Sequence, residues 1–188
     1  LLLLYQTYRD MGDTDKAKEA FNRAIDENPE YALAHFNLGL IKKEERKFEA
    51  AINHLEKSAK LNPQHTQTHL EIGRIFSGIG KKYKAQIALK TLLHLEESNV
   101  EARCLLAHTI MSISKFDDAL DEYNTALKYE PNNTDALNGI GYAYNKKGQF
   151  EKSLEALYKS FEIDNINTET LTNLGTTLQS IGDIDTAS

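Results

Sequence analysis

Apolar residues recur along the chain at the spacing of a helix. Between Phe48 and Leu61 they stand three or four positions apart, and the same layout returns between Phe116 and Leu127. This spacing gathers apolar side chains on one face, so both segments are predicted to be amphipathic helices. The residues that carry the pattern are Phe48, Ala51, Ile52, Leu55, Ala59 and Leu61, and then Phe116, Ala119, Leu120, Tyr123, Ala126 and Leu127.

Proline and glycine mark a fixed interval along the chain. Pro29 and Pro63 are 34 residues apart, and Pro131 follows after 68, which is twice 34. Eight of the 10 glycines fall at two positions of this unit. One set is Gly39, Gly73, Gly141 and Gly175, and the other is Gly12, Gly80, Gly148 and Gly182. A fixed period of this size is typical of a repeat array.

Each unit is predicted to be a pair of helices. Pro63 and Pro131 end a helix, because proline lacks the N–H donor and disfavours helix in the residue before it. The glycines of the Gly80 set lie between two helical stretches, where a chain reversal needs a permissive backbone. Those of the Gly39 set lie inside the first helix, where glycine costs about 1 kcal/mol relative to alanine. We therefore expect a second helix to approach closely at these glycines.

Small and large residues alternate within the unit in a way that resembles the tetratricopeptide repeat (TPR). The residues that carry the resemblance are Leu38, Gly39, Phe48, Ala51, Leu55, Leu61 and Pro63, then Leu106, Ala107, Phe116, Ala119, Tyr123, Ala126 and Pro131, and then Ile140, Gly141, Tyr144, Gly148, Phe150 and Leu157. The resemblance implies an all-α protein, a right-handed superhelical solenoid of stacked antiparallel helix hairpins. It implies a single TPR array over residues 1–188, with repeats at 1–31 (incomplete), 32–65, 66–99, 100–133, 134–167 and 168–188 (incomplete).

No unit has the tryptophan that the TPR family carries at its fourth position, and three further residues depart from the pattern. Tyr83 stands one place later than the aromatic residue of the other units, and Glu97 and Asn165 replace the closing proline. These departures concern helix ends and leave the predicted fold unchanged.

Both ends of the sequence fall within a unit, so we expect a piece of a longer protein. Repeat arrays usually need polar caps, and uncapped ends favour self-association.

Composition narrows the class of protein. The chain has 22 Lys and Arg against 28 Asp and Glu, a net charge of −6, which makes a general affinity for nucleic-acid phosphates unlikely. No apolar run approaches the roughly 18 residues that a membrane helix needs, so no direct membrane insertion is expected. The single cysteine, Cys104, excludes an internal disulfide and fits a reducing compartment such as the cytoplasm.

Candidates for catalytic or metal chemistry are incomplete. His65 and His69 are four residues apart and could share a helix face as metal ligands, but the pattern supplies no third ligand. His35 and His69 share one repeat position, which favours a packing role. Cys104 and His108 have the spacing of a nucleophile and its base, but no oxyanion hole or orienting group accompanies them. We therefore expect no enzyme activity, no cofactor and no metal.

The first helix of each unit carries a second stripe, nearly opposite its packing face. A helix with only one partner would make this stripe polar, yet here it is mixed. In TPR proteins this stripe lines the concave face, where peptide ligands lie. The resemblance thus implies a binding groove, and its candidate residues, which we call the inner stripe, are Leu33, Phe36, Leu40, Lys43, Leu70, Arg74, Cys104, His108, Met111, Asn138 and Tyr142. The alternative is that neighbouring first helices cover some of these side chains.

Two functions remain open at this point. The first is a non-enzymatic scaffold that binds a peptide or helix of a partner protein in the concave groove. The alternative is a partner- or substrate-recruiting TPR segment of a larger enzyme, such as a glycosyltransferase. Under the first, Phe36→Asp or Met111→Asp is expected to abolish partner capture while leaving helicity and melting nearly unchanged.

Overall fold

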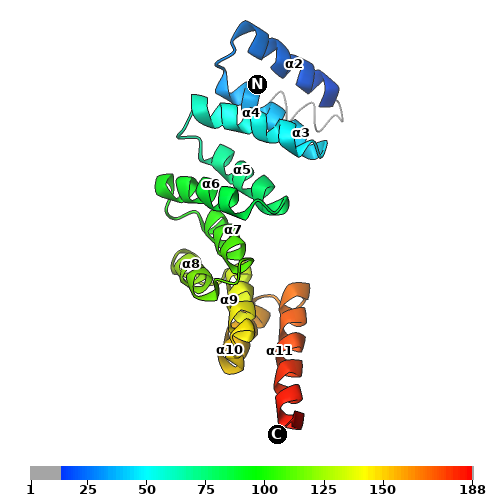
Figure 1. Ribbon diagram of the computed structural model, residues 1–188, viewed down its shortest axis with the longest axis vertical. Coiled ribbons are helices and arrows are strands. Elements are labelled where there is room, and N and C mark those ends of the chain that lie inside the picture. Colours follow the sequence, from blue (N-terminus) through cyan, green and yellow to red (C-terminus); the bar gives the residue numbers. More distant parts are fainter. Residues whose placement is uncertain (1–13, 188) are drawn as a thin grey trace. The chain divides into compact units, whose positions relative to one another are not determined.

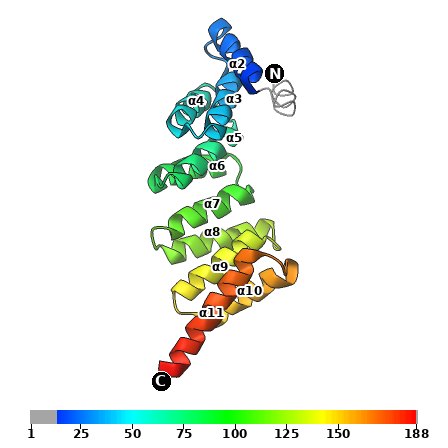
Figure 2. The ribbon, with the colours of Figure 1, turned by 90° about the vertical axis from the view of Figure 1, so that its right-hand side faces the viewer.

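A computed structural model describes residues 14–187, with side chains up to residue 182. All regular secondary structure in this range is helical, which confirms the all-α prediction. The chain divides into two compact units, with the boundary in sequence between Leu95 and Glu96. Each unit is a series of helices in which every helix packs against the next one (Figures 1 and 2). The expectation for Gly12 lies outside the described residues.

The first unit contains five described helices. They are α2 (Thr14–Glu27), α3 (Ala32–Glu44), α4 (Phe48–Leu61), α5 (Thr66–Gly78) and α6 (Lys82–Leu95). The closest pairs are α3 with α4 and α5 with α6, which are the two helices of one repeat. The first helices of these repeats, α3 and α5, also touch each other.

The second unit follows the same plan. Its helices are α7 (Val100–Met111), α8 (Phe116–Tyr129), α9 (Thr134–Lys146), α10 (Phe150–Ile163) and α11 (Thr168–Ala187). The pairs α7 with α8 and α9 with α10 form hairpins, and the first helices α7, α9 and α11 touch in that order. Both units therefore consist of stacked helix hairpins, as the repeat predicted.

Helix boundaries follow the 34-residue period. The second helices of the four complete repeats begin at residues 48, 82, 116 and 150, and each has 14 residues. The helices α4 and α8 end two residues before Pro63 and Pro131. The helices α6 and α10 end at the equivalent places without a proline, so Glu97 and Asn165 do not move the helix ends.

The turn inside each hairpin requires a left-handed backbone. Gly80 and Gly148 have φ values of 74° and 70°, and the equivalent residues Arg46 and Ser114 have φ values of 58° and 61°. In the turns at Arg46, Gly80 and Gly148, the N–H of this residue and the N–H of the next residue both donate to carbonyls of the preceding helix. For example, the Gly80 N–H donates to the Ser77 carbonyl and the Lys81 N–H to the Phe76 carbonyl. This arrangement satisfies carbonyls that the helix end would leave unpaired.

Close approach of the two helices explains the glycines of the Gly39 set. A Cβ atom on Gly39 would lie 2.6 Å from Leu55 Cγ, and one on Gly141 would lie 2.4 Å from Leu157 Cγ. Gly73 meets Leu89 in the same way, at 2.6 Å. The prediction is confirmed at these three positions.

The last repeat, 168–188, departs from the prediction at two glycines. A Cβ on Gly175 would meet nothing within 4 Å. Gly182 was expected in a turn between two helices, but α11 runs through it to Ala187, so that expectation is wrong. Glycine permits the left-handed conformation without requiring it, and an α-helix is equally open to it.

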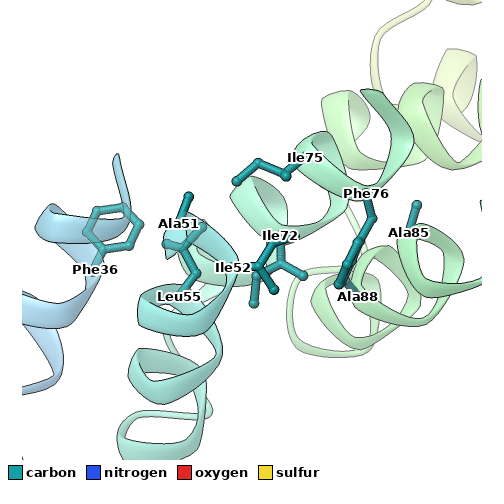
Figure 3. Close-up of a cluster of buried hydrophobic side chains, with 9 residues drawn as sticks. All are labelled: Phe36, Ala51, Ile52, Leu55, Ile72, Ile75, Phe76, Ala85 and Ala88. Carbon is teal, nitrogen blue, oxygen red and sulfur yellow. The ribbon is translucent and has the colours of Figure 1, made fainter. Parts of the chain in front are cut away.

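A cluster of apolar side chains joins the repeats of the first unit. Figure 3 shows Phe36 of α3 on one side of it, and Phe76 of α5 with Ala85 and Ala88 of α6 on the other. Leu55 of α4 is fully buried between them. Burial of this kind is worth about 1.5–3 kcal/mol for each large side chain, so it holds successive hairpins together. The cluster comprises Phe36, Ala51, Ile52, Leu55, Ile72, Ile75, Phe76, Ala85 and Ala88.

Candidate functional site

The inner stripe is not uniformly accessible. Phe36 and Leu70 are only 5% and 3% exposed, and Asn138 is fully buried. The Phe36 ring meets the His65 ring edge to face at a centroid distance of 4.8 Å, where α5 begins. Asn138 of α9 accepts a hydrogen bond from the Thr170 hydroxyl of α11, at 2.9 Å. The first contact joins α3 to the residue that precedes α5, and the second joins α9 to α11.

These contacts correct two expectations. Phe36 and Leu70 are too deeply buried to offer an open surface to a ligand, and Phe36 packs in the apolar cluster with residues of α4, α5 and α6. An aspartate in place of Phe36 would bury a charge within the apolar cluster, so the expected preservation of the fold does not apply to Phe36→Asp. The sequence pattern could not separate the two cases, since an apolar residue on this stripe suits both a ligand and a neighbouring helix.

The remaining stripe residues reach the surface to different degrees. On the first unit, Leu33 and the Arg74 side chain are each 38% exposed. On the second unit, His108 is exposed and Tyr142 is 38% exposed, with Lys146 Nζ 5.1 Å from its ring centroid. The half-buried members are Leu40, Lys43, Cys104 and Met111.

A buried carboxylate organises the charges of the stripe on the first unit. The Glu71 side chain is only 4% exposed, and its two oxygens take different partners. Lys43 Nζ of α3 lies 2.6 Å from Oε2, and Arg74 Nη1 of α5 lies 2.6 Å from Oε1. Two cations around one carboxylate leave a net charge of +1. Both cationic side chains remain about one-third exposed.

Sequence reasoning did not single out Glu71. The sequence feature that could have indicated Glu71 is its place between two apolar residues of the same helix, Leu70 and Ile72, both of which are buried. Charged side chains are seldom buried without a partner. That rule pointed to a cation on an adjacent repeat, and Lys43 stands 28 residues earlier.

The structure shows why Cys104 is a poor nucleophile. Its Sγ lies 3.8 Å from Asn133 Oδ1, and the side chain is half-buried. Burial, followed by the nearby carboxylates of Asp135 and Glu130, raises the pKa of this thiol to about 12. The reactive form of cysteine is the thiolate, so at neutral pH the group is protonated.

His35 and His69 make equivalent contacts with the carbonyl of a proline. Nε2 of His69 lies 2.9 Å from the Pro63 carbonyl, and Nε2 of His35 lies 3.2 Å from the Pro29 carbonyl. Arg103 occupies the same repeat position, and its Nη2 donates to the Glu97 carbonyl at 2.8 Å. The prediction that His35 and His69 are packing residues agrees with these contacts. Among the described residues, no three His, Cys, Asp or Glu side chains form a group that could hold a metal ion.

Comparison with protein families decides the class. A family model described as "TPR repeat" matches residues 6–45 and 111–148. Two models described as "Tetratricopeptide repeat" match residues 32–65 and 134–167. The chain belongs to the tetratricopeptide repeat family. TPR arrays are protein-interaction scaffolds, and that general role applies to this chain; their fold is typical of non-enzymatic proteins.

Solved structures share the TPR-like solenoid fold. The crystal structure of MamA has 23% sequence identity and a TM-score of 0.80, covering 85% of this chain and 93% of that one. MamA 41-end from Desulfovibrio magneticus RS-1 has 14% identity and a TM-score of 0.79, covering 88% and 93% of the two chains. These identities establish the fold alone. A comparison with curated proteins found no match.

The structure also bears on membrane association. Among the helices of the described part, none is both long and apolar enough to cross a bilayer.

One shallow hollow of about 500 Å³ lies at the start of α4, away from the inner stripe, and is lined by Lys47, Phe48, Glu49, Ala50 and Asn53.

Proposed function

We propose that the inner stripe binds a peptide segment of a partner protein, and that on the first unit this segment carries an acidic side chain. The observation that carries the proposal is the arrangement around Glu71. This buried carboxylate holds Lys43 and Arg74 at fixed positions, each 2.6 Å from one of its oxygens. Ion pairs of this kind pre-order long side chains that would otherwise lose rotamer freedom on binding.

An exposed and a half-buried apolar residue of the stripe, Leu33 and Leu40, provide the rest of the recognition. Leu33 lies at the start of α3 and Leu40 lies two turns further along the same helix. A large apolar side chain contributes about 1.5–3 kcal/mol when it is fully buried. Association itself costs roughly 4–15 kcal/mol, so two such contacts are too few. A segment that spans several repeats supplies enough contacts, whereas a small metabolite does not.

The second unit carries its own part of the inner stripe, with a different character. His108 is exposed on α7, Met111 is half-buried at the end of the same helix, and Tyr142 is exposed on α9. An aromatic ring and a thioether accommodate apolar groups of varied shape. We propose that this surface receives an apolar side chain of the same class of ligand.

A displayed library of random linear peptides tests the proposal. Peptides enriched on the protein are expected to combine Asp or Glu with an aliphatic or aromatic residue. Arg74→Gln removes one exposed cation while Lys43 continues to pair with Glu71, so the fold is preserved. We expect Arg74→Gln and Leu33→Asp each to weaken an enriched peptide by about tenfold.

The matched control is Lys57→Gln, which makes the same change of charge on the outward face of α4, where Lys57 is exposed. Circular dichroism verifies that all variants keep their helices. Equal loss in Arg74→Gln and Lys57→Gln would reduce the effect to net charge and refute recognition by the inner stripe. Failure to enrich any peptide would refute the proposed function altogether.

A further inference from the structure

Among the second helices, α6 differs from the others on its outward face. At two equivalent positions, one helical turn apart, the other complete repeats have polar residues: Glu49 and Asn53 in α4, Asp117 and Asp121 in α8, and Glu151 and Glu155 in α10. In α6 the same positions hold Tyr83 and Ile87. These side chains are 74% and 67% exposed, so the first unit itself does not bury them.

The shift of one aromatic residue explains the exposure of Tyr83. Phe48, Phe116 and Phe150 begin their helices, and Phe48 is only 38% exposed. In α6 the first helical residue is Lys82, and the aromatic residue follows one place later, about 100° further round the helix. The opposite face of α6 is buried, because Ala85 and Ala88 on that face belong to the same apolar cluster as Phe76 (Figure 3).

The charge of α6 also differs from that of its counterparts. The segment from residue 79 to residue 95 contains four lysines and no Asp or Glu, whereas each of α2, α4, α8 and α10 contains at least two acidic residues. This basic segment stands out in a chain of net charge −6. Lys84 and Lys90 are exposed on either side of Ile87, and Lys84 Nζ lies 5.4 Å from the Phe76 ring centroid.

We propose that the outward face of α6 is a second docking surface, separate from the inner stripe, for an acidic amphipathic helix of a partner protein. Tyr83 and Ile87 would contact the apolar face of that helix, and the lysines would pair with carboxylates at its edges. Complementary charge selects the partner and speeds its association. The exposed stripe continues through Lys90, Thr91 and His94, over roughly 16 Å, which is the length of a helix of three turns.

The shape of the surface favours a helix over a lipid bilayer. Two apolar side chains on a helix whose other face is buried offer too little area for insertion, which in interfacial helices uses a whole apolar face. Side chains four residues apart form a ridge that packs into the groove between side chains of another helix.

A library of displayed amphipathic helices of about five turns tests the proposal. It is screened against the unaltered protein and against a variant with Tyr83→Glu and Ile87→Asn, which are the residues of α4 at these positions. Both sites are exposed, so the variant is expected to keep its helicity and melting temperature. Helices enriched only on the unaltered protein are expected to be acidic, to bind about tenfold more weakly to the variant and to weaken as salt is added.

The matched control changes the equivalent positions of α4, with Glu49→Gln and Asn53→Asp, and is expected to keep full binding. Arg74→Gln is also expected to keep it, which separates this surface from the inner stripe. Enrichment of basic helices, or of helices that bind the variant equally, would overturn the proposal. So would sedimentation with anionic phosphatidylserine vesicles, or concentration-dependent association in light scattering, if either depends on Tyr83 and Ile87 while no acidic helix binds.

Discussion

Three glycines inside first helices leave room for a leucine from the second helix of the same repeat. At Gly141 an added Cβ would lie 2.4 Å from Leu157 Cγ, while at the equivalent Gly175 it would meet nothing within 4 Å. The two positions therefore share a sequence signature and differ in environment. One glycine is required by packing, and the other lies in a helix without that contact.

This difference predicts stability changes of opposite sign. Gly141→Ala is expected to lower the free energy of unfolding by about 1–3 kcal/mol, because it overpacks the contact with Leu157. Gly175→Ala is expected to raise it by about 1 kcal/mol, because alanine is the better helix former. Urea unfolding followed by circular dichroism measures both. Changes of the same sign in the two variants would contradict the packing described for the last repeat.

At the scale of the element, the turn between paired helices has the same left-handed backbone conformation in each complete repeat, at a glycine in two turns and at a residue with a side chain in two others. Gly80 and Gly148 adopt positive φ without a steric penalty, whereas Arg46 and Ser114 adopt it with a Cβ atom. A left-handed conformation costs an ordinary residue roughly 1–2 kcal/mol. The repeat thus keeps its hairpin geometry even where the local sequence opposes it.

The turn gives a second prediction. Gly148→Ala is expected to destabilise the protein by roughly 1–2 kcal/mol, since the new side chain must adopt the left-handed conformation. Ser114→Gly is expected to stabilise it by up to about 1 kcal/mol, because relief of strain exceeds the added freedom of the unfolded chain. Thermal melting of both variants tests this, and a neutral Gly148→Ala would show that the turn can adopt another backbone.

The sequence predicted the elements well because their determinants are local. The 34-residue period placed the helices, and the glycines of the Gly39 set revealed the close contacts. The continuation of α11 through Gly182 was missed, because glycine is compatible with both a turn and a helix. The left-handed residues at Arg46 and Ser114 were missed because neither residue type signals that conformation.

The candidate site could be predicted only in part, because accessibility is a property of stacked repeats. The helical wheel placed Phe36 on the inner stripe, but its packing against residues of α4, α5 and α6 decides how much of the side chain is covered. Glu71 joins residues of two repeats, so its role follows from the stacking of α3 and α5. By contrast, the exposure of Tyr83 follows from a one-residue shift that was visible in the sequence.

At the scale of the whole molecule, the histidines are unevenly distributed. Five of the six lie in the first unit, and only His108 lies in the second. Burial, followed by the nearby His35, lowers the pKa of His54, whose Nδ1 lies 3.2 Å from Nδ1 of His35. Burial, followed by the nearby His69, lowers the pKa of His65, whose Nδ1 lies 2.6 Å from the Thr68 hydroxyl. In both side chains the shift favours the neutral form over the charged form.

This distribution predicts that mild acid destabilises the protein through its first unit. The pKa of a histidine in the unfolded chain is about 6.5, and the folded pKa values of His54 and His65 lie below it. As the pH falls through about 6.5, the unfolded chain takes up protons that the folded chain does not, so the free energy of unfolding decreases. Urea unfolding at about pH 7.5 and about pH 6 is expected to show this loss. Replacing both residues with glutamine should reduce the difference, whereas His108→Gln, at an exposed site of the second unit, provides the matched control. A difference that survives the double substitution would show that other groups bind the protons.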